Sequence, residues 1–99
     1  MRPHELPCGI IAPNKKLAQF CFTLKNVPGA LAKIASEMAR WHINILSGHI
    51  TALPDEEFGY ATFFADLTDL TVDTGALIEK LRSLDVVEDV YMVEPEIPT

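Results

Sequence analysis

The order in which hydrophobic periodicity changes along this chain limits its possible folds more than any other feature. Apolar residues alternate over residues 17–24, which predicts a strand with Phe20, Phe22 and Leu24 on one face. A spacing of three and four residues follows, which predicts a helix that runs to about Trp41. The positions that follow this helical spacing are Leu31, Ile34, Ala35, Met38 and either Arg40 or Trp41.

The remainder of the chain predicts two strands, a second helix and a last strand. Residues 43–53 and 59–67 predict a hairpin around the polar turn 54–57. The second amphipathic helix is marked by Leu77, Ile78, Leu81 and Leu84, and residues 86–93 predict the last strand. The order β-α-β-β-α-β predicts an α+β fold, a ferredoxin-like sandwich of one antiparallel four-stranded sheet with two helices on one face.

Proline and polarity divide the chain into three parts. We expect an extended N-terminal arm over residues 1–16, which contains three prolines and has room for a short strand at 8–11. A folded domain over 17–94 and a C-terminal tail over 95–99 complete the division. Residues 1–7 lack the apolar run of a signal peptide, so we expect none, and no run reaches the roughly 20 apolar residues that a membrane span needs. We therefore expect a cytoplasmic protein without a membrane partner.

Composition argues against several classes of function. The 99 residues carry 8 basic and 14 acidic side chains, a net charge of −6, so nucleic acid is not an expected partner. The histidines lack metal-binding spacing, and Cys8 and Cys21 form no CxxC pair, so we expect no metal, no cofactor and free thiols. The acidic runs 55–57 and 88–89 indicate solvated charge, and we expect no catalytic residue. A hydrophobic fraction of 48% in so short a chain favours a partner subunit.

The turn between the first strand and the first helix is the candidate functional feature. Asn26 is a favoured N-cap residue, and Pro28 suits the first turn of a helix. The amides of Gly29, Ala30 and Leu31 then lack intrahelical partners, and the helix dipole there favours a carboxylate. Gly29 lets a ligand approach the backbone, and Asn26 can donate and accept hydrogen bonds. The local alternative is that Asn26 only caps the helix and Gly29 only relieves the turn.

Residues 23–34, TLKNVPGALAKI, resemble the opening of an ACT domain, in which an N-x-P-G-x-L turn joins the first strand to the first helix. Ile43-Asn44-Ile45 is similar to the start of that family's second strand, and residues 77–93 fit its second helix and final strand. The resemblance covers about residues 17–94. It implies a regulatory module that binds an amino acid or a similar small molecule.

The resemblance also implies that two chains pair side by side into a homodimer or a higher homo-oligomer with a continuous sheet. The ligand would lie between the turn of one chain and the second strand of its neighbour. The implied ligand-binding residues are Asn26, Val27, Pro28, Gly29, Ala30 and Leu31 from one chain and Asn44, Ile45 and Leu46 from the other. Leu24 stands where some amino-acid-binding members have histidine, which favours a different or more apolar ligand. Such a domain would modulate a separate partner enzyme or pathway.

Two other functions are compatible with the sequence. The same fold could serve as an interaction module that pairs with itself or with an enzyme subunit and binds no small molecule. A small acylphosphatase-like enzyme could also share the fold, but it would need an arginine in a phosphate-binding first loop. Here that loop holds only Lys25 as a basic residue, so the enzyme is the weaker alternative.

Overall fold

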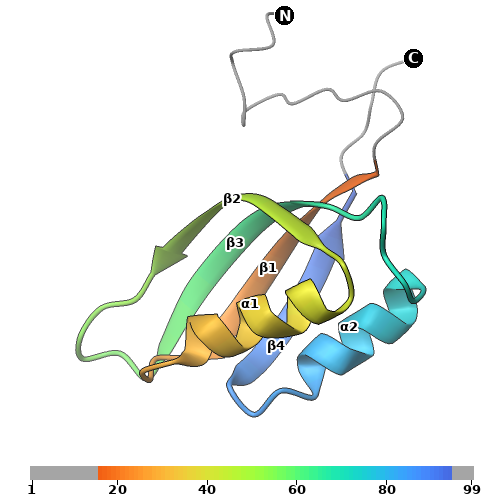
Figure 1. Cartoon of the computed structure of the whole chain (residues 1–99). Helices are drawn as coiled ribbons and strands as arrows, with labels where there is room; N and C mark the ends of the chain where they lie inside the picture. The colour runs from red at the N-terminus through yellow and green to blue at the C-terminus, as the bar shows by residue number, and fades with distance from the viewer. Residues whose placement is uncertain (1–15, 95–99) are drawn as a thin grey trace, which may run out of the picture.

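The computed structural model describes residues 16–94. Its elements are β1 (Leu17–Lys25), α1 (Ala30–Arg40), β2 (Asn44–Thr51), β3 (Phe58–Asp66), α2 (Thr74–Arg82) and β4 (Val87–Val93). Both helices lie on the same face of the sheet (Figure 1). The predicted βαββαβ order and ferredoxin-like fold are therefore confirmed. The predicted arm, including its strand at 8–11, and the predicted tail lie outside the described residues, except for Lys16.

Strand β1 lies in the middle of an antiparallel sheet whose strand order is β2-β3-β1-β4. It pairs with β3 without a slip, from Leu17 opposite Asp66 to Lys25 opposite Phe58. Strands β2 and β3 form the predicted hairpin, with a register shift at Leu46 that leaves this residue without an opposite partner. Strands β2 and β4 are the two edges of the sheet.

The core lies between the helices and one face of the sheet. The predicted alternation in β1 is confirmed, because Phe20, Phe22 and Leu24 are 0%, 2% and 5% exposed. Ile34 and Met38 of α1 pack into the same cluster and are fully buried. Burial of side chains of this size contributes about 1.5–3 kcal/mol each, so this face fixes how β1 is oriented.

Helix α1 buries a narrower stripe than its sequence predicts. Its buried residues are Ala30, Ile34 and Met38, which repeat every four residues. The prediction that Leu31 lies on the buried stripe is wrong, because its side chain is 41% exposed. Each residue rotates the helix by about 100°, so a stripe that begins at Ala30 turns Leu31 away from the sheet.

Left-handed backbone flanks α1 at both ends. Gly29, with φ of 83°, is the N-cap residue, and no side chain caps the helix. The prediction that Asn26 is the N-cap is therefore wrong, because Asn26 lies three residues too early and its side chain binds elsewhere. At the other end His42 has φ of 64°, while its amide and that of Ile43 donate to the carbonyls of Ala39 and Met38.

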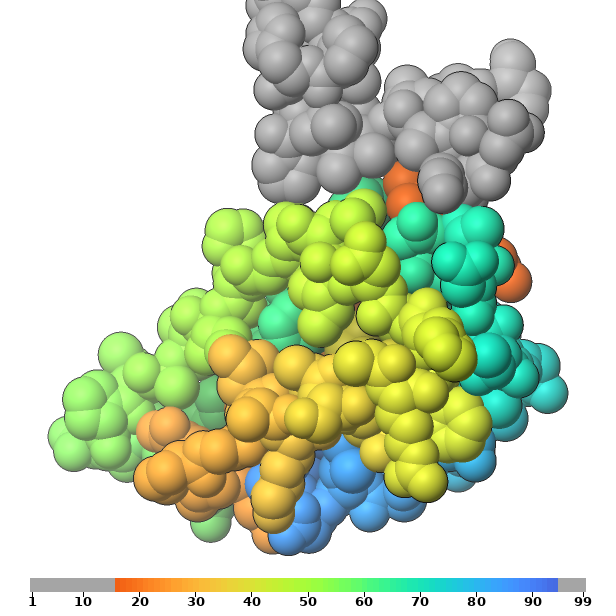
Figure 2. Space-filling model, in the orientation of Figure 1, coloured from red at the N-terminus to blue at the C-terminus, as the bar shows by residue number. Residues whose placement is uncertain are grey.

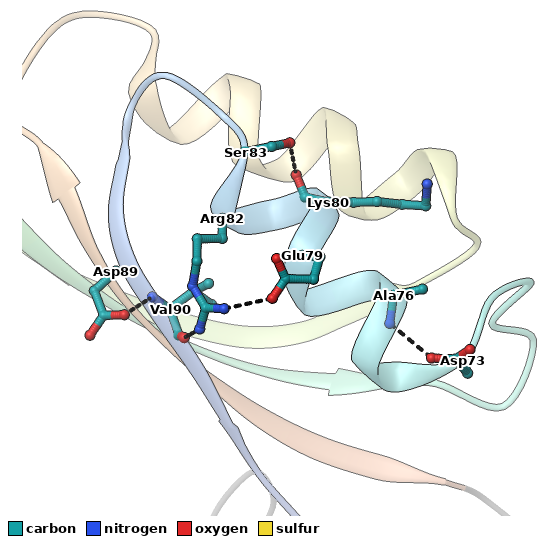
Figure 3. A network of polar contacts seen from close by, with 8 residues as sticks. All are labelled: Asp73, Ala76, Glu79, Lys80, Arg82, Ser83, Asp89 and Val90. Atoms are coloured by element: carbon teal, nitrogen blue, oxygen red, sulfur yellow. Dashed lines mark hydrogen bonds and ion pairs between the residues drawn. The ribbon is translucent and has the colours of Figure 1, made fainter.

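Helix α2 is capped and tied to β4 by polar contacts (Figure 3). The Asp73 carboxylate accepts a hydrogen bond of 2.8 Å from the Ala76 amide at the start of the helix. The Arg82 guanidinium donates to Glu79 at 2.8 Å and to the Val90 carbonyl at 3.3 Å. The last contact joins the end of α2 to an edge strand. Within residues 16–94, no helix is long and apolar enough to cross a bilayer.

The sheet face opposite the helices carries the alternate residues of each strand. We call it the open face. Its middle consists of three rows that cross β2, β3, β1 and β4 in that order, and the pairs Leu17–Asp66 and Lys25–Phe58 lie on the same face beyond them. The rows are Ser47, Phe64, Gln19 and Val93; His49, Thr62, Cys21 and Tyr91; and Thr51, Tyr60, Thr23 and Asp89. Tyr60, Tyr91 and Val93 are 63%, 57% and 46% exposed, whereas Phe64 is half-buried.

A side chain at Gly48 should destabilise the fold. A Cβ atom there would lie 2.5 Å from Cδ1 of Phe63, whose ring is buried in the core. We expect Gly48→Ala to lower the free energy of unfolding by about 1–3 kcal/mol, because the ring must shift. Gly75→Ala in α2 is the control, since its Cβ would meet Asp73 at an ordinary 3.4 Å. Urea denaturation of both variants measures the difference, and equal stabilities would contradict the expectation.

Exchanging residue types at the two ends of α1 should change stability in opposite directions. Gly29→Ala places a Cβ on left-handed backbone and should cost about 1–2 kcal/mol, although the space around it is open. His42→Gly removes the same penalty and should raise stability by up to about 1 kcal/mol. Thermal or chemical denaturation reports both changes. A Gly29→Ala protein as stable as wild type would show that this turn does not depend on glycine.

Candidate ligand-binding site

A concave pocket of about 370 Å³ opens beside the turn that joins β1 to α1. Residues of the turn and of the first turn of α1 form one wall, and the distal part of the β2–β3 hairpin forms the other. The lining residues are Leu24, Lys25, Asn26, Val27, Gly29, Ala30, Leu31, Ala32, Ile50, Ala52 and Gly59. Figure 2 shows the start of α1, in orange, beside the hairpin, in green.

The wall of the pocket is mainly apolar. Val27, Leu31 and Ile50 are 47%, 41% and 43% exposed, so their side chains are available to a ligand. Lys25 supplies the one ionisable side chain of this lining. A pocket of this kind suits a small molecule that has an apolar part and a few polar groups.

Backbone amides supply hydrogen-bond donors at the start of α1. The prediction of three free amides is wrong for Ala30, whose amide donates to the Val27 carbonyl at 3.2 Å. The Gly29 and Leu31 amides have no hydrogen-bond partner among residues 16–94. The first turn of α1 also contains no acidic residue that could neutralise the positive end of the helix. An anionic group would therefore be stabilised here by two donors and by the helix dipole.

The Asn26 side chain holds the hairpin loop against the turn. Its Nδ2 donates to the carbonyls of Leu53 at 2.8 Å and Glu56 at 3.0 Å, and its backbone amide donates to the Glu57 carbonyl at 2.9 Å. Two carbonyl partners fix the orientation of the amide group, because only its nitrogen can donate. Asn26 thus positions one wall of the pocket, and Oδ1 is the atom it could offer to a ligand.

The structure brings together the turn residues of the predicted site but not those of the second strand. Asn44, Ile45 and Leu46 begin β2, whereas Ile50, near its other end, lines the pocket. At about 3.3 Å per residue, Asn44 and Ile50 lie roughly 20 Å apart along the strand. A single chain therefore does not place Asn44 in its own pocket.

Sequence reasoning missed the residues that the hairpin contributes, namely Ile50, Ala52 and Gly59. A signal for them was present in the predicted pairing. Because β1 ends at Lys25 opposite Phe58, the start of β3 must lie beside the turn that follows β1. The end of β2 then lies there too, since β2 is antiparallel to β3.

Ionisable groups of residues 16–94 outside the pocket show no cluster of the kind that binds a metal. Within residues 16–94, no group of three His, Cys, Asp or Glu residues could hold a metal ion. The pKa of the Tyr91 phenol lies above its ordinary value of 10.0, because of a hydrogen bond with Cys21 and then the negative charge that Cys21 and Asp89 can carry. Tyr91 is therefore uncharged at neutral pH, and it lies on the open face, away from the pocket.

Sequence comparison finds a relative of this chain, although no family model matches it. An ACT domain-containing protein from Lysinibacillus sphaericus is 33% identical over 70 residues, which cover 71% of this chain. The same alignment covers 44% of that protein, so this chain spans less than half of its relative.

Solved structures share the fold described above. The ACT domain from the GTP pyrophosphokinase of Chlorobium tepidum superposes with a TM-score of 0.61 at 17% identity, over 80% of this chain and 99% of that domain. The ligand-free regulatory subunit of aspartate kinase from Thermus thermophilus gives a TM-score of 0.60 at 16% identity, over 79% of this chain and 50% of that one. With the N-x-P-G-x-L turn in place between β1 and α1, and with the sequence relative above, this chain belongs to the ACT domain family.

Proposed function

We propose that this domain is a regulatory module that binds an amino acid with an apolar side chain in the pocket beside Gly29. The observation that carries the proposal is the pair of amides, of Gly29 and Leu31, at the edge of an otherwise apolar pocket. The α-carboxylate would accept hydrogen bonds from these amides, and the side chain would contact Val27 and Ile50. Lys25 alone offers no acid–base pair, which supports binding rather than catalysis.

A second copy of the chain would complete the site. Strand β2 is an edge with unpaired backbone groups, and Leu46 and Ile50 on it are each 43% exposed. If two β2 strands pair antiparallel about their midpoint, between Ser47 and Gly48, then Asn44 of one copy lies opposite Thr51 of the other. The proposed ligand-binding residues Asn44, Ile45 and Leu46 would then approach the partner's pocket, which they cannot reach in their own chain.

The partner in regulation would be an enzyme. Two of the structures with this fold are described as parts of enzymes, an ACT domain of a GTP pyrophosphokinase and a regulatory subunit of an aspartate kinase. We extend this arrangement to the present chain, with the ACT domain at residues 17–94 and a cytoplasmic location. Ligand binding at the β2 edges would change how the paired domains contact that enzyme.

Thermal-shift and calorimetric screening against the twenty amino acids tests the proposal. We expect valine, leucine, isoleucine or phenylalanine to raise the unfolding midpoint by about 5 °C or more at a hundredfold excess over Kd, and aspartate and glutamate to have no effect. Leu31→Glu should abolish the response, because it places a negative charge beside the donors. Ala39→Glu adds the same charge to an exposed position of α1 outside the pocket lining and should respond like wild type.

Two results would contradict the proposal. A folded protein that responds to none of the twenty amino acids would not be an amino-acid sensor. If it also copurified with an enzyme subunit, the interaction module would be the better description, and the exposed apolar residues near β2 would be its contact surface. A response that survives Leu31→Glu would place the site elsewhere.

A further inference from the structure

The middle of the open face is almost free of charge in a strongly charged chain. The sequence contains 14 acidic and 8 basic residues, yet Asp89, on the edge strand β4, is the single Asp, Glu, Lys or Arg in the three rows. The ion pairs of the described residues, such as Lys33 with Asp85 and Arg82 with Glu79, involve the helices. On this face charge is therefore confined to Asp89 on the edge strand and to the margins beyond the three rows, where Asp66 and Lys25 lie.

The side chains that replace charge on the open face are typical of protein interfaces. Tyr60, Tyr91 and Val93 are all about half exposed or more, and Phe64 lies on β3 in the same row as Val93. Tyrosine and phenylalanine are enriched, and charged residues depleted, in the centres of protein–protein interfaces. Serine, threonine and glutamine fill most of the other positions, together with His49, Cys21 and Asp89, so polar partners are available across a contact.

The open face is also large enough for a specific contact. Four strands spaced about 4.8 Å apart, each seven to nine residues long at about 3.3 Å per residue, outline roughly 500 Å² for the whole face, its charged margins included. A specific interface buries at least about 500 Å² on each partner. A sheet face is too flat to enclose a small molecule, and a face whose margin carries Lys25 but whose middle lacks basic residues does not suit nucleic acid.

We infer that the open face is a second self-association surface, on which a second copy of this chain stacks sheet against sheet. Two copies of the chain, each with a net charge of −6, repel each other through their acidic surfaces. The nearly uncharged middle of the open face lets two copies come into contact with little repulsion. The contact is isologous, so the middle of the open face of one copy contacts the same region of the other copy. Stacked sheets lie about 10 Å apart, which leaves room for the tyrosine rings to interdigitate.

This surface is separate from the pocket and from the β2 edge. The three rows of the open face point away from the helices, whereas the lining residues of the pocket lie on the helix side or in the turn, apart from Lys25 at the end of β1. Edge pairing through β2 and stacking through the open face can therefore occur together. Together they would give a tetramer of four copies, and stacking alone would give a dimer.

Mass measurement by size-exclusion chromatography with light scattering tests the inference. We expect Tyr91→Glu and Tyr60→Glu each to halve the mass of the wild-type assembly, because each places a charge in the stacked face. Both side chains are more than half exposed in a single chain, so a folded subunit tolerates the change, which circular dichroism verifies. Ala39→Glu is the control with the same added charge on an exposed helix position, and it should keep the wild-type mass.

Alkylation of Cys21 gives a second measurement at the centre of the open face. In a Cys8→Ser background, Cys21 should react at least about tenfold more slowly in the assembled protein than after dilution or in Tyr60→Glu. Cys21 is partly exposed in a single chain, so stacking is what would protect it, and Tyr60 lies opposite Thr23 rather than Cys21. A rate that does not depend on concentration or on Tyr60→Glu would overturn the inference.

The masses also separate this inference from the proposed function. Leu31→Glu should abolish the amino-acid response, whereas Tyr91→Glu should lower the mass and keep that response. A wild-type monomer, or a mass that neither tyrosine substitution changes, would overturn stacking without affecting the proposed ligand site. Conversely, if Tyr91→Glu halves the mass of the assembly but the protein binds no amino acid, stacking would be supported and the proposed function would be wrong.

Discussion

The alternation of side chains along β1 is the constraint on which the rest of the domain depends. Phe20, Phe22 and Leu24 face the helices and are buried, so Cys21 and Thr23 must face the other way. A shift of one residue would move every apolar side chain to the wrong face, so burial of the two phenylalanines fixes the register. The same register places β3 beside β1 and the end of β2 beside the turn. Both the pocket and the open face therefore follow from how this strand packs.

The turn after β1 is explained mainly by the fold, and it also leaves backbone amides free to donate hydrogen bonds. Left-handed backbone at Gly29 lets the chain pass directly from strand to helix, and an added Cβ would meet open space. The glycine is thus explained by its φ rather than by room for a ligand. Both hydrogens of the Asn26 side-chain amide are donated to carbonyls of the hairpin loop. What remains for a ligand is the Asn26 Oδ1 and two backbone donors, the Gly29 and Leu31 amides.

Periodicity alone predicted the order of elements, the hairpin and the helix-covered face, because these depend on local spacing and on one buried side of each element. It could not predict that Leu31 is exposed, since the stripe of α1 that packs on the sheet begins at Ala30, one residue before Leu31. Nor could it predict that Asn26 binds the carbonyls of Leu53 and Glu56, which lie 27 and 30 positions further along the chain. Long-range contacts of this kind depend on register. For Asn44, Ile45 and Leu46 a single chain supplies no contact with the pocket, so their proposed role depends on a second copy.

Strand β2 is where ligand binding and assembly would influence each other. Ile50 lines the pocket, while its neighbours His49 and Thr51 belong to the open face, because adjacent residues of a strand point to opposite sides. A ligand that orders this edge strand would also order two rows of the stacking surface. By linkage, an assembly that a ligand stabilises must bind that ligand more tightly by the same factor. A regulatory response could then arise from a change in assembly, transmitted through one strand, without any rearrangement of the core.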